Sequence, residues 1–265
     1  MSCASASKCF AVDSGGNILA SDASGAWRVA ATDGQSNLES ISCPSARFCA
    51  AVDNNGDVVV LSNGTWSDPV SIDSETGLNS ISCPSAAFCV AVDSAGNAFT
   101  YTGSVTNWSE ANVANGDTLA SVSCTSASFC AAVDQNGNVY TYQSGTWSSA
   151  DAVDNDNEFV QVSCSSASFC AAIDDNGNAA ILSGGNWTAG SMPATATSIS
   201  CPGAGYCVAV DGNGAALVYQ NGAWSAPVKV DGNNQFATIS CSSDTSCAAA
   251  DQYDNVLYYN ASGSH

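Results

Sequence analysis

Three observations predict an all-β fold for this chain, a β-propeller with seven blades. The 14 cysteines form seven pairs with five residues between the partners, and the pairs recur every 37 to 41 positions. Each period contains four short runs with the residue types of β-strands, separated by turn sequences rich in Gly, Asn and Asp. A repeat near 40 residues with four strands per unit is typical of propeller blades, which bury their faces against neighbouring copies.

The cysteine pairs indicate one disulfide per blade. They are Cys3/Cys9, Cys43/Cys49, Cys83/Cys89, Cys124/Cys130, Cys164/Cys170, Cys201/Cys207 and Cys241/Cys247. Because none is left over, we expect disulfides and a secreted, extracellular protein. A thiolate metal site is the alternative, but such sites usually have closer CxxC spacing or histidine partners, and the only histidine is the terminal His265. A disulfide closing so short a loop is worth roughly 2 kcal/mol in the loop-entropy model.

The second copy of the repeat shows the four strands of a blade most clearly. We expect strand A at 38–43, strand B at 49–53, strand C at 57–61 and strand D from Thr65 to Ile72. Strand A alternates Leu and Ile with polar residues, which is the period of two of a half-buried strand. The dipeptide Asn63-Gly64 is a strong hairpin signal between strands C and D. The cysteine pair then joins the end of strand A to the start of strand B, so we expect all seven disulfides on one face of the propeller.

Two further residue types recur once per blade. An Asp ends strand B, where its carboxylate is expected to accept backbone hydrogen bonds in a tight turn; these are Asp13, Asp53, Asp93, Asp134, Asp174, Asp211 and Asp251. Aromatic residues open strand D and precede the second cysteine, and both sets are expected to pack between blades. They are Trp27, Trp66, Trp108, Trp147, Trp187 and Trp224, and Phe48, Phe88, Phe129, Phe169 and Tyr206.

The segment Leu61-Ser62-Asn63-Gly64-Thr65-Trp66 resembles the Asp-box hairpin of sialidase-type propellers, in which Ser-x-Asp-x-Gly-x-x-Trp joins strands C and D. The Asp of that box is absent here and the loop is shorter, so this resemblance implies only the order of strands in a blade. The near-identical copies also resemble the blades of bacterial and fungal propeller lectins, which implies carbohydrate binding. Neither resemblance carries a catalytic residue.

We expect a single propeller domain over residues 1–265. Its repeat units lie near 1–36, 37–76, 77–117, 118–157, 158–195, 196–234 and 235–261, and 262–265 resembles the remnant of a purification tag. No signal peptide precedes Met1, which favours a mature or recombinant fragment.

The seventh copy stops after strand C, at Leu257-Tyr258-Tyr259, with no Trp and no strand D. Its blade is therefore expected to have three strands, and the ring to close by packing between blades one and seven. A six-bladed ring is the alternative. The open edge of the last blade also predicts self-association, because an unpaired strand edge can accept a strand from another chain.

The net charge of −20, from 4 Lys and Arg against 24 Asp and Glu, excludes nucleic acid as a partner. The absence of any run of about 18 apolar residues excludes membrane insertion. In a propeller, the B–C turns and D–A crossovers share one face, and 20 of the acidic residues fall in these segments. Such a face could hold Ca²⁺, attract a cationic partner or bind sugar hydroxyls, or it could simply be a solvated surface. The densest cluster, Asp154, Asp156 and Glu158, is the candidate Ca²⁺ site; otherwise no cofactor is expected.

Catalysis is not expected. Cysteines held in disulfides and a single terminal histidine leave no Ser-His or Cys-His nucleophile. A sialidase-like site would need a cluster of arginines, and the chain has only Arg28 and Arg47. Two carboxylates could hydrolyse glycosides, but an acid and a base need different environments, and carboxylates related by the repeat share one.

The favoured prediction is a secreted, multivalent, lectin-like propeller, because near-identical blades create near-identical grooves whose weak binding adds up through avidity. The candidate ligand-binding residues are Trp66, Trp108, Trp147 and Trp187, with core packing as their alternative role. The alternative function is a structural or protein-interaction propeller of a cell surface or extracellular assembly. A lectin should keep the same groove residues in most blades, whereas an interaction scaffold should break the repeat in one place. The deviations fall around blades five and six, at 154–158 and 194–198.

Overall fold

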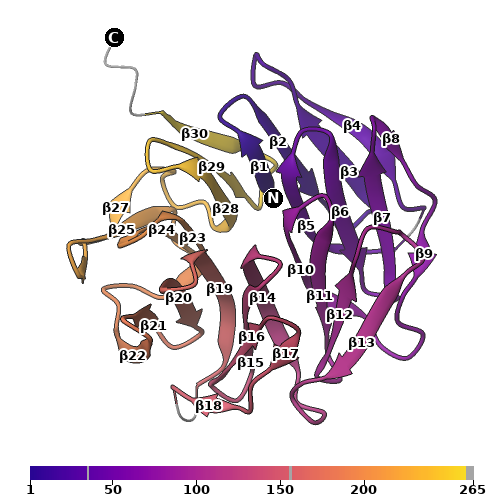
Figure 1. Cartoon of the computed structure of the whole chain (residues 1–265). Coiled ribbons are helices and arrows are strands. Elements are labelled where there is room, and N and C mark those ends of the chain that lie inside the picture. Colours follow the sequence, from indigo (N-terminus) through magenta and orange to yellow (C-terminus); the bar gives the residue numbers. More distant parts are fainter. Residues whose placement is uncertain (35, 155–156, 261–265) are drawn as a thin grey trace.

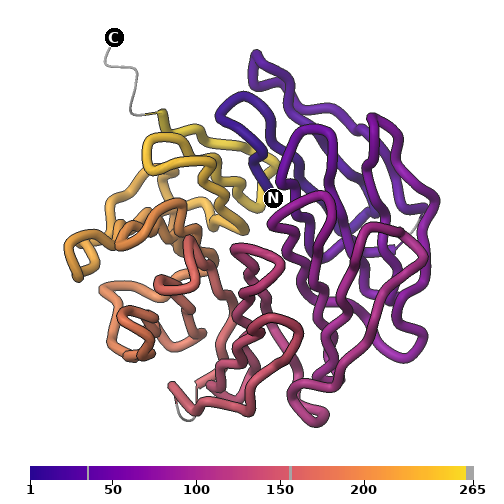
Figure 2. The backbone as a smooth tube through the Cα atoms, in the orientation of Figure 1, coloured from indigo at the N-terminus to yellow at the C-terminus, as the bar shows by residue number. Residues whose placement is uncertain are grey.

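Seven antiparallel sheets, one per repeat, form a ring in the computed structural model, which describes residues 1–34, 36–154 and 157–260 (Figure 1). Strand A of each sheet lies innermost (Figure 1), and the chain passes once round the ring from the indigo blade to the yellow blade (Figure 2). The seven-bladed prediction is confirmed, and the six-bladed alternative is wrong. Among the described residues, no helix has the length and apolarity needed to cross a membrane.

Blades one, three and five contain four continuous strands. Blade one has β1 (Ser2–Ser5), β2 (Lys8–Val12), β3 (Asn17–Ser21) and β4 (Trp27–Thr32). Blade three has β10 (Leu78–Ser85), β11 (Phe88–Asp93), β12 (Asn97–Tyr101) and β13 (Trp108–Asn112). Blade five has β19 (Phe159–Ser166), β20 (Phe169–Asp174), β21 (Asn178–Ser183) and β22 (Asn186–Ser191).

Blades two, four and six have strand D in two short pieces. Blade two has β5 (Leu38–Ser45), β6 (Phe48–Asp53), β7 (Asp57–Ser62), β8 (Thr65–Trp66) and β9 (Val70–Ser71). Blade four has β14 (Leu119–Ser126), β15 (Phe129–Asp134), β16 (Asn138–Gln143), β17 (Thr146–Trp147) and β18 (Asp151–Ala152). Blade six has β23 (Ala196–Gly203), β24 (Tyr206–Asp211), β25 (Ala215–Gln220), β26 (Ala223–Trp224) and β27 (Val228–Lys229).

In each of these three blades, a serine directly follows the Trp and accepts an N–H of strand C. Blade three also has a serine there, but Ser109 Oγ donates to the Thr100 carbonyl at 3.4 Å and strand D stays continuous. In blade two, the Val60 N–H donates to Ser67 Oγ at 3.0 Å, so a side chain takes the place of a ladder carbonyl. Ser148 and Ser225 accept the equivalent N–H in blades four and six, both at 3.0 Å. Pro69 and Pro227 then follow in blades two and six, and proline has no N–H to continue the ladder.

Blade seven has three strands, β28 (Phe236–Ser243), β29 (Ser246–Asp251) and β30 (Val256–Asn260), as predicted. The predicted tag remnant at 262–265 lies outside the described residues.

The core consists of apolar clusters between adjacent blades rather than one central core. Strand B is buried along its whole length in blades two to five, since each blade is covered on both faces. Six such clusters, one at each interface from blades one and two to blades six and seven, occur among the described residues. The described residues of blades one and seven form no such cluster, and their contacts include a 3.0 Å hydrogen bond from Trp27 Nε1 to Tyr258 Oη.

All fourteen cysteines form the seven predicted disulfides, with Cα–Cα distances of 3.9 to 4.1 Å. The bonds are Cys3–Cys9, Cys43–Cys49, Cys83–Cys89, Cys124–Cys130, Cys164–Cys170, Cys201–Cys207 and Cys241–Cys247. The pairing is confirmed, and the metal alternative for the cysteines is wrong.

The disulfides lie beside the A–B turns, as expected, and the cysteines of strand B also belong to the core. All seven are buried. Cys247 is 7% exposed, and the other six are at most 2% exposed: Cys9, Cys49, Cys89, Cys130, Cys170 and Cys207. Six of the seven, all except Cys9, pack into the apolar clusters between blades. Their sulfur atoms therefore fill space between blades as well as cross-linking the A–B hairpins. Because these residues are buried, they are not accessible to a ligand.

The two cysteines of a pair face each other across strands A and B, as Cys124 and Cys130 do. Their narrow spacing is that of a pair without mutual backbone hydrogen bonds. The N–H of the first cysteine consequently points away from strand B, toward the centre of the ring.

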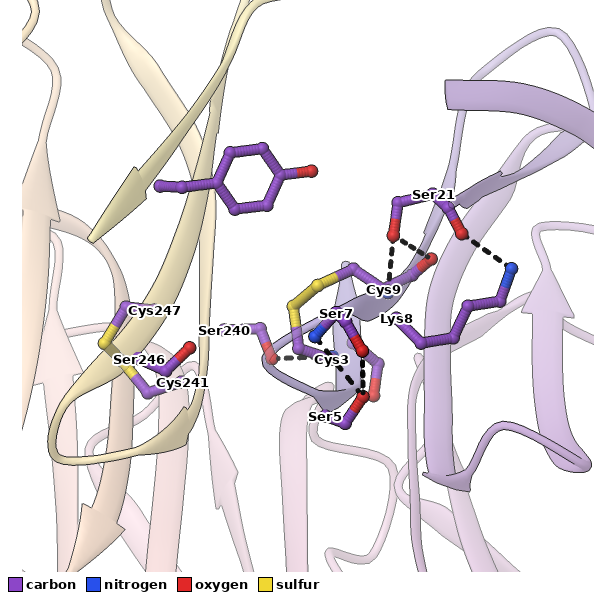
Figure 3. The surroundings of a disulfide bond; sticks show 12 residues. Cys3, Ser5, Ser7, Lys8, Cys9, Ser21, Ser240, Cys241, Ser246 and Cys247 are labelled. Atoms are coloured by element: carbon purple, nitrogen blue, oxygen red, sulfur yellow. Dashed lines mark hydrogen bonds between the residues drawn. A yellow bond between two sulfur atoms is a disulfide. The ribbon is translucent and has the colours of Figure 1, made fainter. Parts of the chain in front are cut away.

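A serine before each first cysteine supplies the acceptor for that N–H. The hydroxyl of one blade accepts the N–H of the first cysteine in the next blade, at 2.8 to 3.0 Å. The seven pairs are Ser2–Cys43, Ser42–Cys83, Ser82–Cys124, Ser123–Cys164, Ser163–Cys201, Ser200–Cys241 and Ser240–Cys3. The last bond closes the ring between blades seven and one (Figure 3). We call this set the serine ring.

Ser240→Ala tests the serine ring at the point of closure. Loss of the hydroxyl leaves the partly buried Cys3 N–H without its acceptor, and we expect the free energy of unfolding to fall by about 1–3 kcal/mol. Guanidinium denaturation with the disulfides intact measures it. The exposed Ser149→Ala is the matched control and should change stability by less than about 0.5 kcal/mol. Equal stability of the two variants would contradict the structural role of the ring.

Candidate functional site

A cavity of about 970 Å³ opens at blades five, six and seven on the face formed by the A–B and C–D turns. The two kinds of turn adjoin each other on this face, as shown in blade four by the 3.1 Å hydrogen bond from the Ser144 N–H to the Ser128 carbonyl. The A–B turns of all three blades and the C–D turns of blades five and six line the cavity. We call it the turn-face cavity.

Two glycines in the A–B turn of blade six create the space. A Cβ atom added to Gly203 or Gly205 would have nothing within 4 Å. In the six other blades a serine occupies the position of Gly203 and accepts the N–H two residues later. These serines are Ser5, Ser45, Ser85, Ser126, Ser166 and Ser243. Blade six therefore lacks a side chain that the repeat otherwise places on this face.

Polar groups also enter the turn-face cavity where the repeat has apolar ones. Tyr206 stands where blades two to five have Phe, and Asp244 stands where blades two to six have Ala. Burial, followed by the influence of Tyr259 and Asp244, raises the pKa of Tyr206. Its hydroxyl is therefore neutral at physiological pH and can both donate and accept a hydrogen bond. Tyr219 and Gln220 complete a wall with one aromatic face and several polar atoms.

These features were only partly predictable. From the sequence, Tyr206 is expected to pack between blades, whereas Asp244 and Gly203 have no expected role. The signal was present as departures from the repeat at positions 203, 206 and 244. The sequence does not show that blades five, six and seven lie close together on one face. This proximity brings the three departures from the repeat into one cavity.

The four Trp residues predicted to bind ligand lie at four different interfaces between blades, and each is half-buried. Trp66 packs edge-on against Phe10 of the preceding blade at 6.3 Å between ring centroids. Trp108 and Trp147 pack on the tyrosine opposite them in their own blade, at 5.2 and 5.4 Å. Trp187 packs on the cluster between blades four and five. The structure thus places them in the packing role, and ligand binding by them stays a prediction.

The predicted Ca²⁺ ligands differ in their surroundings. Asp154 is buried, its Oδ1 accepts the Asn157 side-chain N–H at 2.9 Å, and its carboxyl lies within hydrogen-bonding reach of Asp174 in the next blade. Glu158 is exposed, and Asp156 lies outside the described residues. Among the residues that the structure describes, no group of three or more His, Cys, Asp or Glu side chains is placed to hold a metal ion.

The Asp that ends strand B performs the predicted turn role in every blade. In blade four, Asp134 Oδ1 accepts the N–H of Asn136 at 2.9 Å and of Asn138 at 2.8 Å. Six of these seven residues are buried, so the alternative of a solvated surface is wrong for them; they are Asp53, Asp93, Asp134, Asp174, Asp211 and Asp251. An Asn side chain donates to the second carboxylate oxygen in five blades, from Asn17, Asn97, Asn138, Asn178 and Asn255.

Blade two departs from this pattern and concentrates negative charge. Asp57 stands where five other blades have the donating Asn, and Asp33 reaches in from the crossover of blade one. Both carboxylate oxygens of Asp33 and Oδ2 of Asp53 are buried, and no donor reaches them while both groups are ionised. Burial, followed by the hydrogen bond that a protonated Asp33 can share with Asp53 and by repulsion from Asp53 and Asp57, raises the pKa of Asp33 to about 7.

No protein-family model matches the sequence, and no curated protein is detectably similar to it in sequence. Solved structures do share its fold. A structure of YCF48 bound to D1 peptide is 17% identical with a TM-score of 0.77, and the match covers 98% of this chain and 91% of that one. The WD40 β-propeller domain of Doa1 is 12% identical with a TM-score of 0.80, covering 97% and 90%. U3-55K is 9% identical with a TM-score of 0.83, covering 98% and 94%. At these identities the likeness establishes the propeller fold alone.

Asp33→Asn tests the buried carboxyl pair through the pH dependence of stability. An unfolded Asp ionises near pH 4, so between about pH 4 and pH 7 the folded state keeps a proton that the unfolded state has lost. Stability from this group therefore falls as pH rises through that window. We expect Asp33→Asn to raise the free energy of unfolding at pH 8 more than at pH 4.5. Urea denaturation across this range measures the difference, with the exposed Asp68→Asn as control. A pH-independent effect of Asp33→Asn would contradict the shifted pKa.

Proposed function

We propose that this protein is a non-catalytic binding propeller of an oxidising, extracellular compartment, and that the turn-face cavity holds a segment of a protein partner. One observation carries the proposal: the cavity lies where blades six and seven depart from the repeat, whereas the repeated grooves are filled by aromatic packing. A departure from the repeat that also opens a concave, partly polar surface is typical of a ligand site rather than of a structural element.

The disulfides support the compartment. Seven local disulfides with no free cysteine are a framework that persists outside the cytosol, where thiols are not kept reduced. Each clips a hairpin without linking blades covalently, so the ring itself depends on other contacts.

The side chains of the cavity support binding without catalysis. Its wall provides the Tyr206 hydroxyl, the Asp244 carboxylate and several serine hydroxyls, with no histidine or thiol to activate them. Nucleophilic catalysis needs such a base beside the nucleophile. Hydroxyl and carboxylate groups around an aromatic wall are instead suited to hold a polar ligand in one orientation.

The charge of the protein indicates the kind of segment. Asp244 lies at the cavity, and the chain as a whole carries a charge of −20. A peptide segment with a Lys or Arg beside an aromatic or apolar residue would pair with Asp244 and pack on the Tyr206 and Tyr219 rings. The similar propeller YCF48 was solved with a peptide bound, which supports a peptide as the ligand class.

A peptide library tests this proposal. Phage displaying random peptides of about 12 residues are selected on the full chain, and enriched peptides are synthesised and measured by calorimetry. We expect enriched peptides to carry a basic residue, and Asp244→Ala to weaken binding about tenfold or more, because a charge-assisted hydrogen bond is worth about 1.5–3 kcal/mol.

Asp244→Ala preserves the fold because Ala is the residue of the repeat at this position. The converse change Ala46→Asp places a carboxylate on the same turn of blade two and is the matched control; it should leave the affinity within twofold. The proposal is wrong if no peptide is enriched, or if the affinity of enriched peptides is unchanged by Asp244→Ala.

Carbohydrate binding is a second candidate, favoured by the same wall. An aromatic ring beside hydroxyl, amide and carboxylate groups can stack on a sugar ring and hydrogen-bond its hydroxyls, and Tyr206, Gln220 and Asp244 provide these groups. Such a lectin would have its site at blades five to seven, in addition to any repeated sites at the Trp residues.

A glycan array separates the two kinds of lectin site. Binding that is lost in Gly203→Ser, which refills the turn with the serine of the six other blades, would place a sugar in the turn-face cavity. Binding that persists in Gly203→Ser but falls about tenfold in Trp108→Phe would favour the repeated grooves. An array without any bound glycan contradicts the carbohydrate candidate.

A further inference from the structure

Blade seven ends at a strand edge that the other six blades cover. Among the described residues, β30 pairs only with β29, so the outer backbone groups of Val256–Asn260 have no partner strand. Five consecutive residues with a free edge provide a template for a further strand.

The other blades show what normally covers this edge. In each of these blades, strand D carries a Trp at or near its start. This Trp pairs with a residue at or near the end of strand C. The pairs are Ser21–Trp27, Leu61–Trp66, Tyr101–Trp108, Tyr142–Trp147, Leu182–Trp187 and Tyr219–Trp224. Tyr259 is the equivalent residue of blade seven, since it lies opposite Cys247 as Tyr142 lies opposite Cys130.

Exposure shows the effect of the missing Trp. Tyr101 and Tyr142 are 5% and 8% exposed beneath their Trp neighbours, whereas Tyr259 is 52% exposed. The tyrosine surface that Trp108 and Trp147 cover in blades three and four is therefore open to solvent in blade seven.

An apolar groove of about 460 Å³ continues inward from Tyr259, between blades six and seven. Val208 of strand B, Val228 of strand D and Leu257 of β30 are among its walls, and none of the lining residues carries a charge. Seven large hydrophobic residues are exposed in the described part of the chain, and four of them line this groove: Val228, Val230, Tyr258 and Tyr259. The edge and the groove form one continuous surface, which we call the blade-seven acceptor.

We propose that the blade-seven acceptor binds an extended peptide segment of another protein, which adds antiparallel to β30 as a fourth strand and inserts an aromatic side chain beside Tyr259. This inference goes beyond the proposed function, because it concerns a second surface, which shares only Tyr206 with the turn-face cavity. The antiparallel register of the other blades places the aromatic residue opposite Tyr259 and the next three residues opposite Tyr258, Leu257 and Val256.

The net charge of the protein favours a peptide of another protein over a second copy of this chain as the occupant of the blade-seven acceptor. Two copies carrying −20 each repel one another, while a segment with basic residues is attracted. The uncharged groove in turn requires an uncharged strand, so the Lys or Arg residues belong on either side of it. The outer edges of blades two, four and six are also interrupted after the Trp, which makes them poor partners for β30.

The probe is a synthetic peptide with the sequence Asn186–Ser191 of strand β22, Asn-Trp-Thr-Ala-Gly-Ser, acetylated, labelled with a fluorophore and flanked by one Lys at each end. This segment already pairs with a strand C in blade five, with its Trp opposite Leu182. Fluorescence anisotropy with the full chain measures its affinity, and hydrogen exchange of β30 reports whether backbone pairing occurs.

We expect saturable binding that slows exchange at the β30 amides. Replacing the peptide Trp with Ser should weaken binding at least tenfold, and Tyr259→Ser in the protein should do the same without affecting the fold, because Tyr259 is half exposed. Tyr253→Ser, on the B–C turn of the same blade and 69% exposed, is the matched control and should leave the affinity within twofold.

Three results would overturn the inference: no binding at about 1 mM protein, binding that tolerates both Tyr259→Ser and loss of the peptide Trp, or a dimer in light scattering that Tyr259→Ser dissociates. The last would assign the acceptor to a second copy. Asp244→Ala should leave binding of this probe unchanged. If the proposal for the blade-seven acceptor fails, the proposal for the turn-face cavity therefore still stands, and the reverse also holds.

Discussion

The hydrogen bond from each first cysteine to a serine of the preceding blade is the contact on which the ring depends. Strand A has a partner on one side only, so its inward N–H groups would be buried without acceptors. The serine hydroxyl satisfies one such group at all seven interfaces with the same geometry. The described residues of blades one and seven form no apolar cluster like those at the other interfaces. The junction between these two blades therefore depends on its serine–cysteine hydrogen bond more than the six other junctions do.

The repeat commits most of its distinctive residues to structure. The cysteines clip hairpins and fill the core, the turn Asp residues hold backbone N–H groups, and the Trp residues fill the space between blades. Residues used in this way in blade after blade are not available as ligands without cost to the fold. Binding surfaces therefore arise where a blade departs from the repeat, as at Gly203 and Asp244 in the turn-face cavity and at Tyr259 in the blade-seven acceptor.

The fold could be predicted because its signals are local. The pairing of Cys124 with Cys130, the Asp134 turn and the strand alternation each involve residues within a few positions of one another. The candidate site could not be predicted in the same way. Asp244 was a single acidic residue among 24, and only its position beside the A–B turn of blade six gives it a neighbour such as Tyr206.

The sequence by itself determined the blade: its four strands, its disulfide, its turn chemistry and the loss of strand D in the last copy. The tertiary structure decided what the blades do to one another. The bond from Cys3 to Ser240 spans 237 positions, and no local pattern specifies a contact that depends on seven blades closing one circle. The same holds for exposure. The pairing of Cys49 with Cys43 is local, but its burial requires the neighbouring blade, and Tyr259 differs from Tyr101 and Tyr142 only in what lies beside it.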